Sequence, residues 1–187
     1  MPVDCQKFQI ITERLRLRCF RKEDVDILFK WWSDIDIMKY TPEGIYSYDT
    51  ISDIIHRIVE NYKSVSADNF YAFSLLIEHK DNADKIGWCG IIRMFPFPQN
   101  IEIFVGLDKL YWGQSYAEEA TRALLGFVYN FFGFRTITAL VHPENIPSIK
   151  ILEKIGFSFV RHLDNCPEPY QNHNGFLLFS IKLEKPK

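Results

Sequence analysis

The segment from Ile101 to Phe157 constrains the fold most strongly, because strands and helices alternate along it. Hydrophobic periodicity divides it into a strand, a loop, an amphipathic helix, a second strand and a second helix: Ile101–Leu107, Asp108–Gly113, Ser115–Phe131, Thr136–His142 and Ile146–Ile155. A strand that enters a helix through a tight polar turn gathers unpaired backbone N–H groups at the helix N-terminus, and such a site suits a phosphate or pyrophosphate. The segment therefore predicts a mixed α/β fold with one anion site.

The rest of the chain adds strands and helices of ordinary length. Charged and apolar residues alternate over Thr12–Arg18, which is the period of a half-buried strand. The other predicted elements are two helices and four strands: Lys22–Trp32, a helix beginning at Ser47–Asp49, Phe70–Glu78, Ile86–Arg93, Phe157–His162 and Phe176–Leu183. This order predicts one mixed sheet with helices on its faces. At 187 residues the chain fits a single domain, 1–187.

Charge and hydropathy narrow the classes of partner. The formal net charge of −2 gives no global field that steers the protein to nucleic acid. No apolar run reaches the roughly 18 residues of a membrane span, and the first residues lack the basic-then-apolar pattern of a signal peptide. We therefore expect a cytoplasmic protein with no nucleic-acid partner and no membrane partner.

The four cysteines indicate neither a metal site nor a disulfide framework. Cys5, Cys19, Cys89 and Cys166 are far apart, with no CxxC pair and no histidine at zinc spacing. Cys19 and Cys89 lie inside predicted strands, where a buried free thiol is the expected state. The pattern favours a reducing compartment and no resident metal.

Two motifs carry a resemblance to a known family. Tyr-Trp-Gly-Gln-Ser-Tyr-Ala-Glu-Glu-Ala at 111–120 and Asn-Ile-Pro-Ser-Ile-Lys-Ile-Leu-Glu-Lys-Ile-Gly-Phe at 145–157 resemble the acetyl-CoA-binding half of GNAT N-acetyltransferases. Thr12–Arg18 and Ile86–Gly90 are similar to the opening strand and central hairpin of the RimJ/RimL branch, the ribosomal-protein alanine acetyltransferases. The resemblance spans nearly the whole chain. It implies a mostly antiparallel mixed sheet flanked by about four helices, and acetyl-CoA as the cofactor.

The resemblance also implies which residues hold the cofactor. The family's pyrophosphate loop falls on Trp112–Ala117, its pantetheine-aligning strand on the backbone of Val105–Leu107, and its pantetheine-contacting asparagine on Asn145. The implied cofactor-binding residues are Val105, Gly106, Leu107, Gly113, Gln114, Ser115, Tyr116, Ala117, Asn145 and Ser148.

Two features of the predicted pyrophosphate loop set expectations for its geometry. Ser115 stands where the family usually has glycine, so a positive φ at this position strains the serine, whereas a helical φ lets its N–H donate and its hydroxyl add a contact. Asp108, Glu118 and Glu119 are carboxylates near a helix N-terminus, where they favour the helix dipole. Because they also repel a pyrophosphate, we expect them to point away from it.

Acetyl transfer to an amine needs a proton for the leaving thiolate and a base for the amine. Ser148 matches the hydroxyl that some family members use to protonate the thiolate, while Leu152 stands where other branches have a tyrosine. Glu102, in an otherwise apolar strand, is the candidate base, unless it only caps the exposed start of that strand. His142 is the alternative base, or a structural residue in front of Pro143.

The acceptor and the catalytic status stay open at this stage. The branch resemblance implies a primary amine at a protein N-terminus, and aminoglycoside and polyamine acetyltransferases are similar in fold and in these motifs. A non-catalytic acyl-CoA-binding module is the alternative from another class, motivated by Ser115 and Leu152. Whether the chain acts as a monomer or as a homodimer is also open. Of the adjacent Trp31 and Trp32, one is expected in the core and the other is available to an acceptor pocket.

Overall fold

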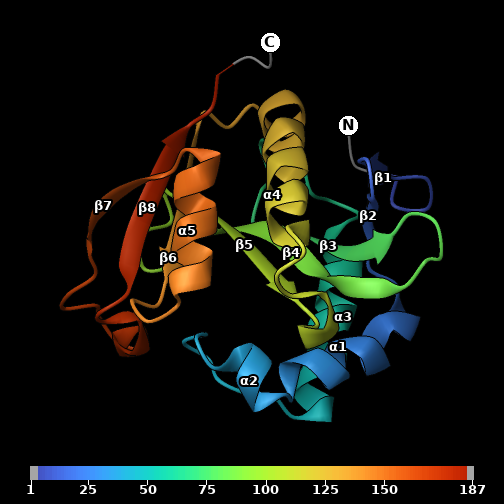
Figure 1. The fold of residues 1–187 in the computed structure, drawn as a ribbon, viewed down its shortest axis with the longest axis horizontal. Helices are drawn as coiled ribbons and strands as arrows, with labels where there is room; N and C mark the ends of the chain where they lie inside the picture. Colours follow the sequence, from blue (N-terminus) through green and yellow to red (C-terminus); the bar gives the residue numbers. More distant parts are fainter. Residues whose placement is uncertain (1–3, 185–187) are drawn as a thin grey trace.

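Eight strands form one sheet, in the spatial order β1-β2-β3-β4-β5-β6-β8-β7, in the computed structural model, which describes residues 4–184 (Figure 1). The strands are β1 (Gln9–Ile11), β2 (Leu15–Cys19), β3 (Ala72–His79), β4 (Lys85–Arg93), β5 (Ile101–Leu107), β6 (Thr136–Val141), β7 (Ser158–His162) and β8 (Leu177–Lys182). Neighbouring strands are antiparallel except β5 and β6, which are parallel. The expected mixed, mostly antiparallel sheet is confirmed.

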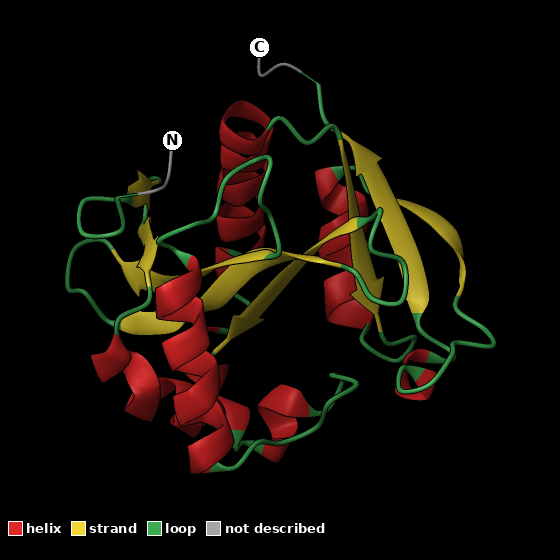
Figure 2. Ribbon diagram, turned by 180° about the vertical axis from the view of Figure 1, so that it is seen from behind, coloured by secondary structure: helices red, strands yellow, loops and turns green. Residues whose placement is uncertain are grey.

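Five α-helices lie on the two faces of the sheet within residues 4–184: α1 (Val25–Trp32), α2 (Ile35–Met38), α3 (Tyr48–Asn61), α4 (Tyr116–Phe127) and α5 (Ile146–Ile155). α4 and α5 cover the face toward the viewer in Figure 1. α3 crosses the opposite face, which Figure 2 shows, with α1 and α2 near one end of it. The four longer helices match the sequence prediction, and α2 is an additional single turn capped by Asp34.

Aromatic rings pack on both faces of the sheet. Beneath α4, the ring centroid of Phe73 on β3 lies 5.6 Å from that of Phe127 and 5.7 Å from that of Phe132. On the opposite face, the fully buried Trp31 of α1 stacks on Trp88 of β4, with 5.6 Å between centroids. Aromatic pairs of this kind add to the stabilisation from burial. The packing holds β3, β4 and β5 in place, and so sets where the loop after β5 begins.

The helix predicted over Ser115–Phe131 is divided in the structure. α4 covers Tyr116–Phe127, and Val128–Phe132 continue as one π-helical turn. Gly133 ends this turn with a φ of 72°, a left-handed conformation that glycine adopts without steric cost.

The prediction of a free thiol at Cys19 is wrong. A disulfide joins Cys19, the last residue of β2, to Cys5, with 5.5 Å between their Cα atoms. β1 pairs antiparallel with β2, Gln9 opposite Arg18, so the chain before Gln9 runs back past the end of β2 and carries Cys5 to Cys19. β1 was not predicted, because three residues are too few to show a period. Cys89 is a buried free thiol, as expected, and its burial raises its pKa.

Neither a membrane span nor a metal cluster is found among residues 4–184. No helix in this range is both long and apolar enough to cross a membrane. No three side chains of the histidine, cysteine, aspartate and glutamate type are grouped there so as to hold a metal ion.

Candidate active site

The sheet is split beside β5, because β5 and β6 share only a short pairing. β5 pairs with β4 along its whole length, from Ile101 to Leu107. Its parallel pairing with β6 is confined, in the described part of the chain, to Glu102 opposite Thr138. The two strands diverge beyond this point (Figure 1). An extended ligand with amide groups fits beside such a strand as an added strand does.

The backbone of β5 directs specific groups into this split. Successive residues of a strand turn their N–H and C=O groups to opposite sides. The N–H of Asp108 donates to the carbonyl of Ile86 on β4, so the backbone groups of Asp108 face β4. By the same alternation the backbone groups of Val105 and Leu107 face the opposite side, toward β6. Trp112 Nε1 donates to the Leu107 carbonyl at 3.0 Å, which occupies that acceptor. The N–H and C=O of Val105 and the N–H of Leu107 are therefore the groups that β5 presents to the split.

Two helices begin at the open end of the split. β5 leads into α4 and β6 leads into α5, and the carboxyl ends of parallel strands lie at the same edge of a sheet. Each helix N-terminus carries unpaired N–H groups and a partial positive charge. The structure thus brings three sequence-predicted segments, 105–107, 113–117 and 145–148, to one edge of the sheet.

Asp108 fixes the loop that joins β5 to α4. Its Oδ2 accepts hydrogen bonds from Lys30 Nζ at 2.6 Å and Trp31 Nε1 at 2.9 Å, both on α1, and its Oδ1 accepts from the Leu110 N–H at 3.1 Å. Burial acts to raise the pKa of Asp108, but these donors, led by the Lys30 ammonium, lower it below its usual range. The carboxylate therefore points toward α1 and away from α4.

Two left-handed residues turn the chain into α4. Gly113 has a φ of 74°, and Ser115, the N-cap of α4, has a φ of 63°. The N–H groups of residues 116–118 have no helical carbonyl before them, which is the arrangement that binds anions. The Ser115 side chain is exposed and makes no capping hydrogen bond. The strain expected for a serine with positive φ is therefore present.

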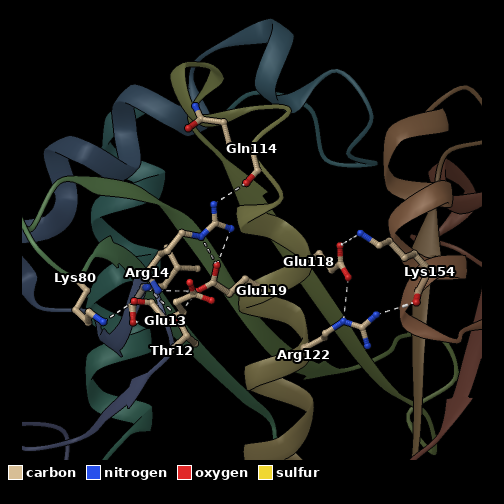
Figure 3. Close-up of polar contacts among 10 residues, drawn as sticks. Thr12, Glu13, Arg14, Lys80, Gln114, Glu118, Glu119, Arg122 and Lys154 are labelled. Carbon is tan, nitrogen blue, oxygen red and sulfur yellow. Dashed lines mark hydrogen bonds and ion pairs between the residues drawn. The ribbon is translucent and has the colours of Figure 1, made fainter.

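Glu119 is turned away from the helix N-terminus and binds the turn between β1 and β2 (Figure 3). It accepts hydrogen bonds from Thr12 Oγ1 at 2.6 Å, from the Arg14 N–H at 2.9 Å and from Arg14 Nε at 2.7 Å. Burial acts to raise the pKa of Glu119, but the bonds from Thr12 and Arg14 outweigh it and lower that pKa. Arg14 also donates to the carbonyl of Gln114 at 3.0 Å, and so it clamps the loop from the side of β2.

Glu118 ties α4 to α5 (Figure 3). Its carboxylate lies 2.7 Å from Lys154 Nζ and 3.1 Å from Arg122 Nε, and the hydrogen bond from Lys154 lowers its pKa. A cavity of about 290 Å³ lies beside these groups, lined by Glu13, Arg14, Ser115, Glu118, Glu119 and Arg122. Two guanidinium groups thus stand next to the predicted pyrophosphate loop.

Asn145 and Ser148 lie in the first turn of α5, across the split. Asn145 is the N-cap, and its Oδ1 accepts from the Ser148 N–H at 3.3 Å. This bond satisfies one donor of the helix start and fixes the direction of the asparagine side chain. The Ser148 side chain is half-buried beside it.

Glu102 lies at the point where β5 and β6 separate. Burial raises its pKa to about 8, the negative charge of Glu43 adds to this rise, and the backbone amide of Leu140 opposes it. His142, at the end of β6, accepts from the Glu144 N–H through Nδ1 at 3.2 Å. Its ring also stacks on Tyr40, with 5.3 Å between centroids. One ring nitrogen of His142 is therefore committed to the local turn.

A group of aromatic side chains lies on the face that carries α1. Trp31 is in the core, as expected for one of the pair, and Trp32 is only partly buried. Trp32 packs against Tyr46 and Trp88, with 5.4 and 5.9 Å between centroids, and its indole Nε1 is buried without a partner among residues 4–184. The loop before Tyr46 is held by Asn172, whose Nδ2 donates to the Pro42 carbonyl at 2.9 Å.

Sequence reasoning missed the side chains that reach this site from distant parts of the chain. Lys30 contacts the loop after β5, and Arg14 and Arg122 line the cavity beside α4. The alternating pattern at Thr12–Arg18 predicted a half-buried strand, but no periodicity relates Arg14 to Glu119, which lies 105 positions later. These contacts follow from the fold and carry no local signal.

A family model described as an acetyltransferase (GNAT) domain matches residues 14–158. The chain belongs to the GNAT acetyltransferase family. It is 32% identical over 151 residues to the uncharacterized N-acetyltransferase p20 of Bacillus licheniformis. The match covers 79% of this chain and 81% of that protein. The chain is thus an N-acetyltransferase that uses acetyl-CoA, and a non-catalytic module is set aside.

Two solved structures share the fold of this acetyltransferase at low sequence identity. Spermidine N-acetyltransferase from Vibrio cholerae, in complex with CoA and spermine, matches with a TM-score of 0.75 at 18% identity. The match covers 91% of this chain and 96% of that one. The acetyltransferase from Salmonella typhimurium that modifies the N-terminal serine of a ribosomal-subunit protein has a TM-score of 0.77 at 13% identity, with coverage of 95% and 100%.

The residues of this acetyltransferase fit the acyl donor of the family, acetyl-CoA. The free edge of β5 suits the amide groups of a pantetheine arm, and the start of α4 suits a pyrophosphate. A Cβ at Gly106 would overlap the Trp88 ring, which explains why that position lacks a side chain.

Proposed function

We propose that this acetyltransferase transfers the acetyl group of acetyl-CoA directly to a primary amine, with donor and acceptor held together in the split beside β5. β5 and β6 pair only at Glu102 and Thr138 among residues 4–184, between the starts of α4 and α5, and this observation supports the proposal most. Acetyl-CoA supplies an activated thioester. The chain's own task is then to hold two reactants in contact, and positioning of this kind accounts for much of the acceleration in reactions between two molecules.

In this proposal β5 provides orientation and polarisation. The N–H and C=O of Val105 bond the pantetheine arm, and the N–H of Val105 or Leu107 donates to the thioester carbonyl, where negative charge develops. The Gly113–Ala117 turn holds the pyrophosphate, and Arg14 keeps that turn in place through its bonds to Gln114 and Glu119. The roles of β5 use backbone groups, so they depend on the position of the strand and not on its side chains.

Asn145 and Ser148 act on the thiol side in this proposal. The capping bond leaves the Nδ2 group of Asn145 available to the pantetheine arm. The hydroxyl of Ser148 gives its proton to the departing thiolate, because no tyrosine stands at position 152.

Glu102 is the base in this proposal. A base works best when its pKa lies near the working pH, and burial raises the pKa of Glu102 to about 8. His142 is less suited, because its Nδ1 already accepts from the Glu144 N–H. The carboxylate of Glu102 takes the amine proton, directly or through one water.

The acceptor that we propose is a small primary amine with a second positive charge. Glu43 is near enough to Glu102 for its negative charge to shift that pKa, and Tyr46 and Trp32 add aromatic surface on the same face. Carboxylates and aromatic faces are the groups that bind organic cations. A protein N-terminus is the second candidate, since the Salmonella typhimurium neighbour modifies an N-terminal serine.

An amine panel tests the proposal through the release of free thiol from acetyl-CoA. We expect the largest kcat/KM with diamines and polyamines, and smaller values with monoamines and with short peptides that begin with serine or alanine. A larger kcat/KM for the peptides favours the second candidate. Tight CoA binding without turnover on any amine contradicts direct transfer.

A further inference from the structure

A second cavity lies at the far edge of the sheet, away from the split beside β5. Its volume is about 470 Å³, and the N-terminal segment, β2, β3 and the turn before α1 form its walls. The lining includes Lys7, Arg16, Arg18, Arg21 and Glu78, with Cys5 in the wall that the disulfide attaches to β2. None of these residues belongs to the acetyl-transfer site proposed above.

Arg18, Lys85 and two buried carboxylates form a closed set of charges at the wall of this cavity. The Arg18 guanidinium lies 2.7 Å from Asp24 and 2.8 Å from Glu78, and Lys85 Nζ lies 3.1 Å from Asp24. Asp24 and Glu78 are only 2% and 7% exposed. Two anions therefore balance two cations, and this set contributes no net charge to the cavity.

The remaining cations face the cavity without full compensation. Arg16 NH1 is 3.9 Å from Glu78 Oε2, a carboxylate that Arg18 already binds, and Arg16 Nε is buried with no partner among residues 4–184. Lys7 has one distant carboxylate, Asp4 at 4.0 Å, and both of those side chains are largely exposed. Arg21 adds a third positive charge. The Arg16 side chain is 36% exposed and shares its one carboxylate with Arg18, so its charge is only partly compensated, and an anionic oxygen is the acceptor that a guanidinium binds best.

We propose that this cavity binds the phosphate group of a small phosphorylated molecule. Arg16 offers a planar fork that matches phosphate geometry, and Lys7 and Arg21 supply further charge from the rim. The volume exceeds what one phosphate fills and lies in the range of about 300–1,000 Å³ that is usual for small-molecule sites. Gln6, Gln9 and Phe8 are the polar and apolar surfaces left for the rest of the ligand.

Calorimetric titration with inorganic pyrophosphate, without reductant, tests this proposal. The titration is run with saturating CoA, so that the loop before α4 is filled, and is repeated without CoA. We expect one pyrophosphate site in the unaltered protein, a Kd about tenfold higher or more in Arg16→Gln, and a smaller loss in Arg16→Lys, which keeps the charge but not the fork. Arg57→Gln, at an exposed position of α3, removes the same charge outside the cavity and leaves the Kd unchanged.

Three results overturn the proposal. They are no pyrophosphate binding with or without CoA, binding that occurs only without CoA, and equal losses in Arg16→Gln and Arg57→Gln. The first means that the cavity holds only water, and the second assigns the anion to the loop before α4. If the protein does not bind CoA, that result speaks against the proposed transfer reaction and not against the cavity. The pyrophosphate titrations of Arg16→Gln and of the unaltered protein can still be compared.

Discussion

Ser115 holds a left-handed backbone conformation at the start of α4, and replacing it with glycine tests how much strain the loop carries. Its φ is 63° and its ψ is 12°, and its exposed side chain makes no capping hydrogen bond. Ser115→Gly therefore removes no packed atom and leaves no buried group without a partner. The change in the free energy of unfolding therefore comes from the backbone alone.

Two opposing terms set the magnitude. An L-residue in the left-handed region costs roughly 1–2 kcal/mol, which glycine does not incur. Glycine makes the unfolded chain more flexible, which destabilises the fold by about 0.4–1 kcal/mol. The free energy of unfolding of Ser115→Gly should thus rise by about 0.5–1 kcal/mol, which raises Tm by about 1–4 °C in a domain of this size.

Urea unfolding and thermal melting measure this change, and Gly113→Ala is the matched control. Gly113 has a φ of 74°, and a Cβ there meets nothing within 4 Å, so alanine adds strain without a clash. We expect Gly113→Ala to lower stability by about 1 kcal/mol. The backbone N–H donors stay in place in Ser115→Gly, so its Kd for CoA should change by less than about threefold. A Ser115→Gly protein that unfolds at lower urea concentration than the unaltered one refutes the strain reasoning.

Three further predictions concern the split beside β5. Because the folded pKa of Glu102 is raised from 4.5 to about 8, its contribution to stability is complete below pH 4.5 and is lost as pH rises through 8. Urea midpoints across this range should therefore fall less in Glu102→Gln than in the unaltered protein. Glu102→Gln should also lose the rise of kcat/KM toward pH 8. Ser148→Ala should lower kcat by about 10²-fold with little change in Kd for CoA, and an unchanged kcat removes Ser148 from the mechanism. Gly106→Ala forces the new Cβ into the Trp88 ring, so we expect a loss of about 1–3 kcal/mol in urea unfolding, and a neutral result contradicts the described packing.

Local sequence signals predicted the elements that build the site. The bounds of β5 and α5 match the predicted Ile101–Leu107 and Ile146–Ile155, because an apolar run and a capping asparagine mark them within a few residues. β1 and α2 escaped prediction, since elements of three and four residues show no period. The disulfide between Cys5 and Cys19 was not predicted either, because the pairing of β1 with β2 is what brings the two cysteines together.

The parts of the site that depend on distant contacts had no sequence signal. The loop residues 113–117 are contiguous, so a motif revealed them, but the motif left open whether Ser115 has a positive or a helical φ. The influence of Glu43 on Glu102, and the clamp of Arg14 on Gln114, arise only when segments far apart in the sequence meet. The assignment of residues 1–187 to one domain stays a prediction: the family model spans 14–158, and residues 1–3 and 185–187 lie outside the described chain.

The short pairing between β5 and β6 also divides the protein into two units of unequal size. β1 to β5 form one continuous ladder, and β6, β8 and β7 form another; among residues 4–184, Glu102 and Thr138 are the single point of strand pairing between them. Cooperative units of a fold open with different free energies when few hydrogen bonds join them. Amide exchange should therefore be faster in the three-strand unit than in the five-strand unit. A molecule that bonds along the edge of β5 becomes a structural member that joins the two units, so binding should slow exchange on both sides of the split together.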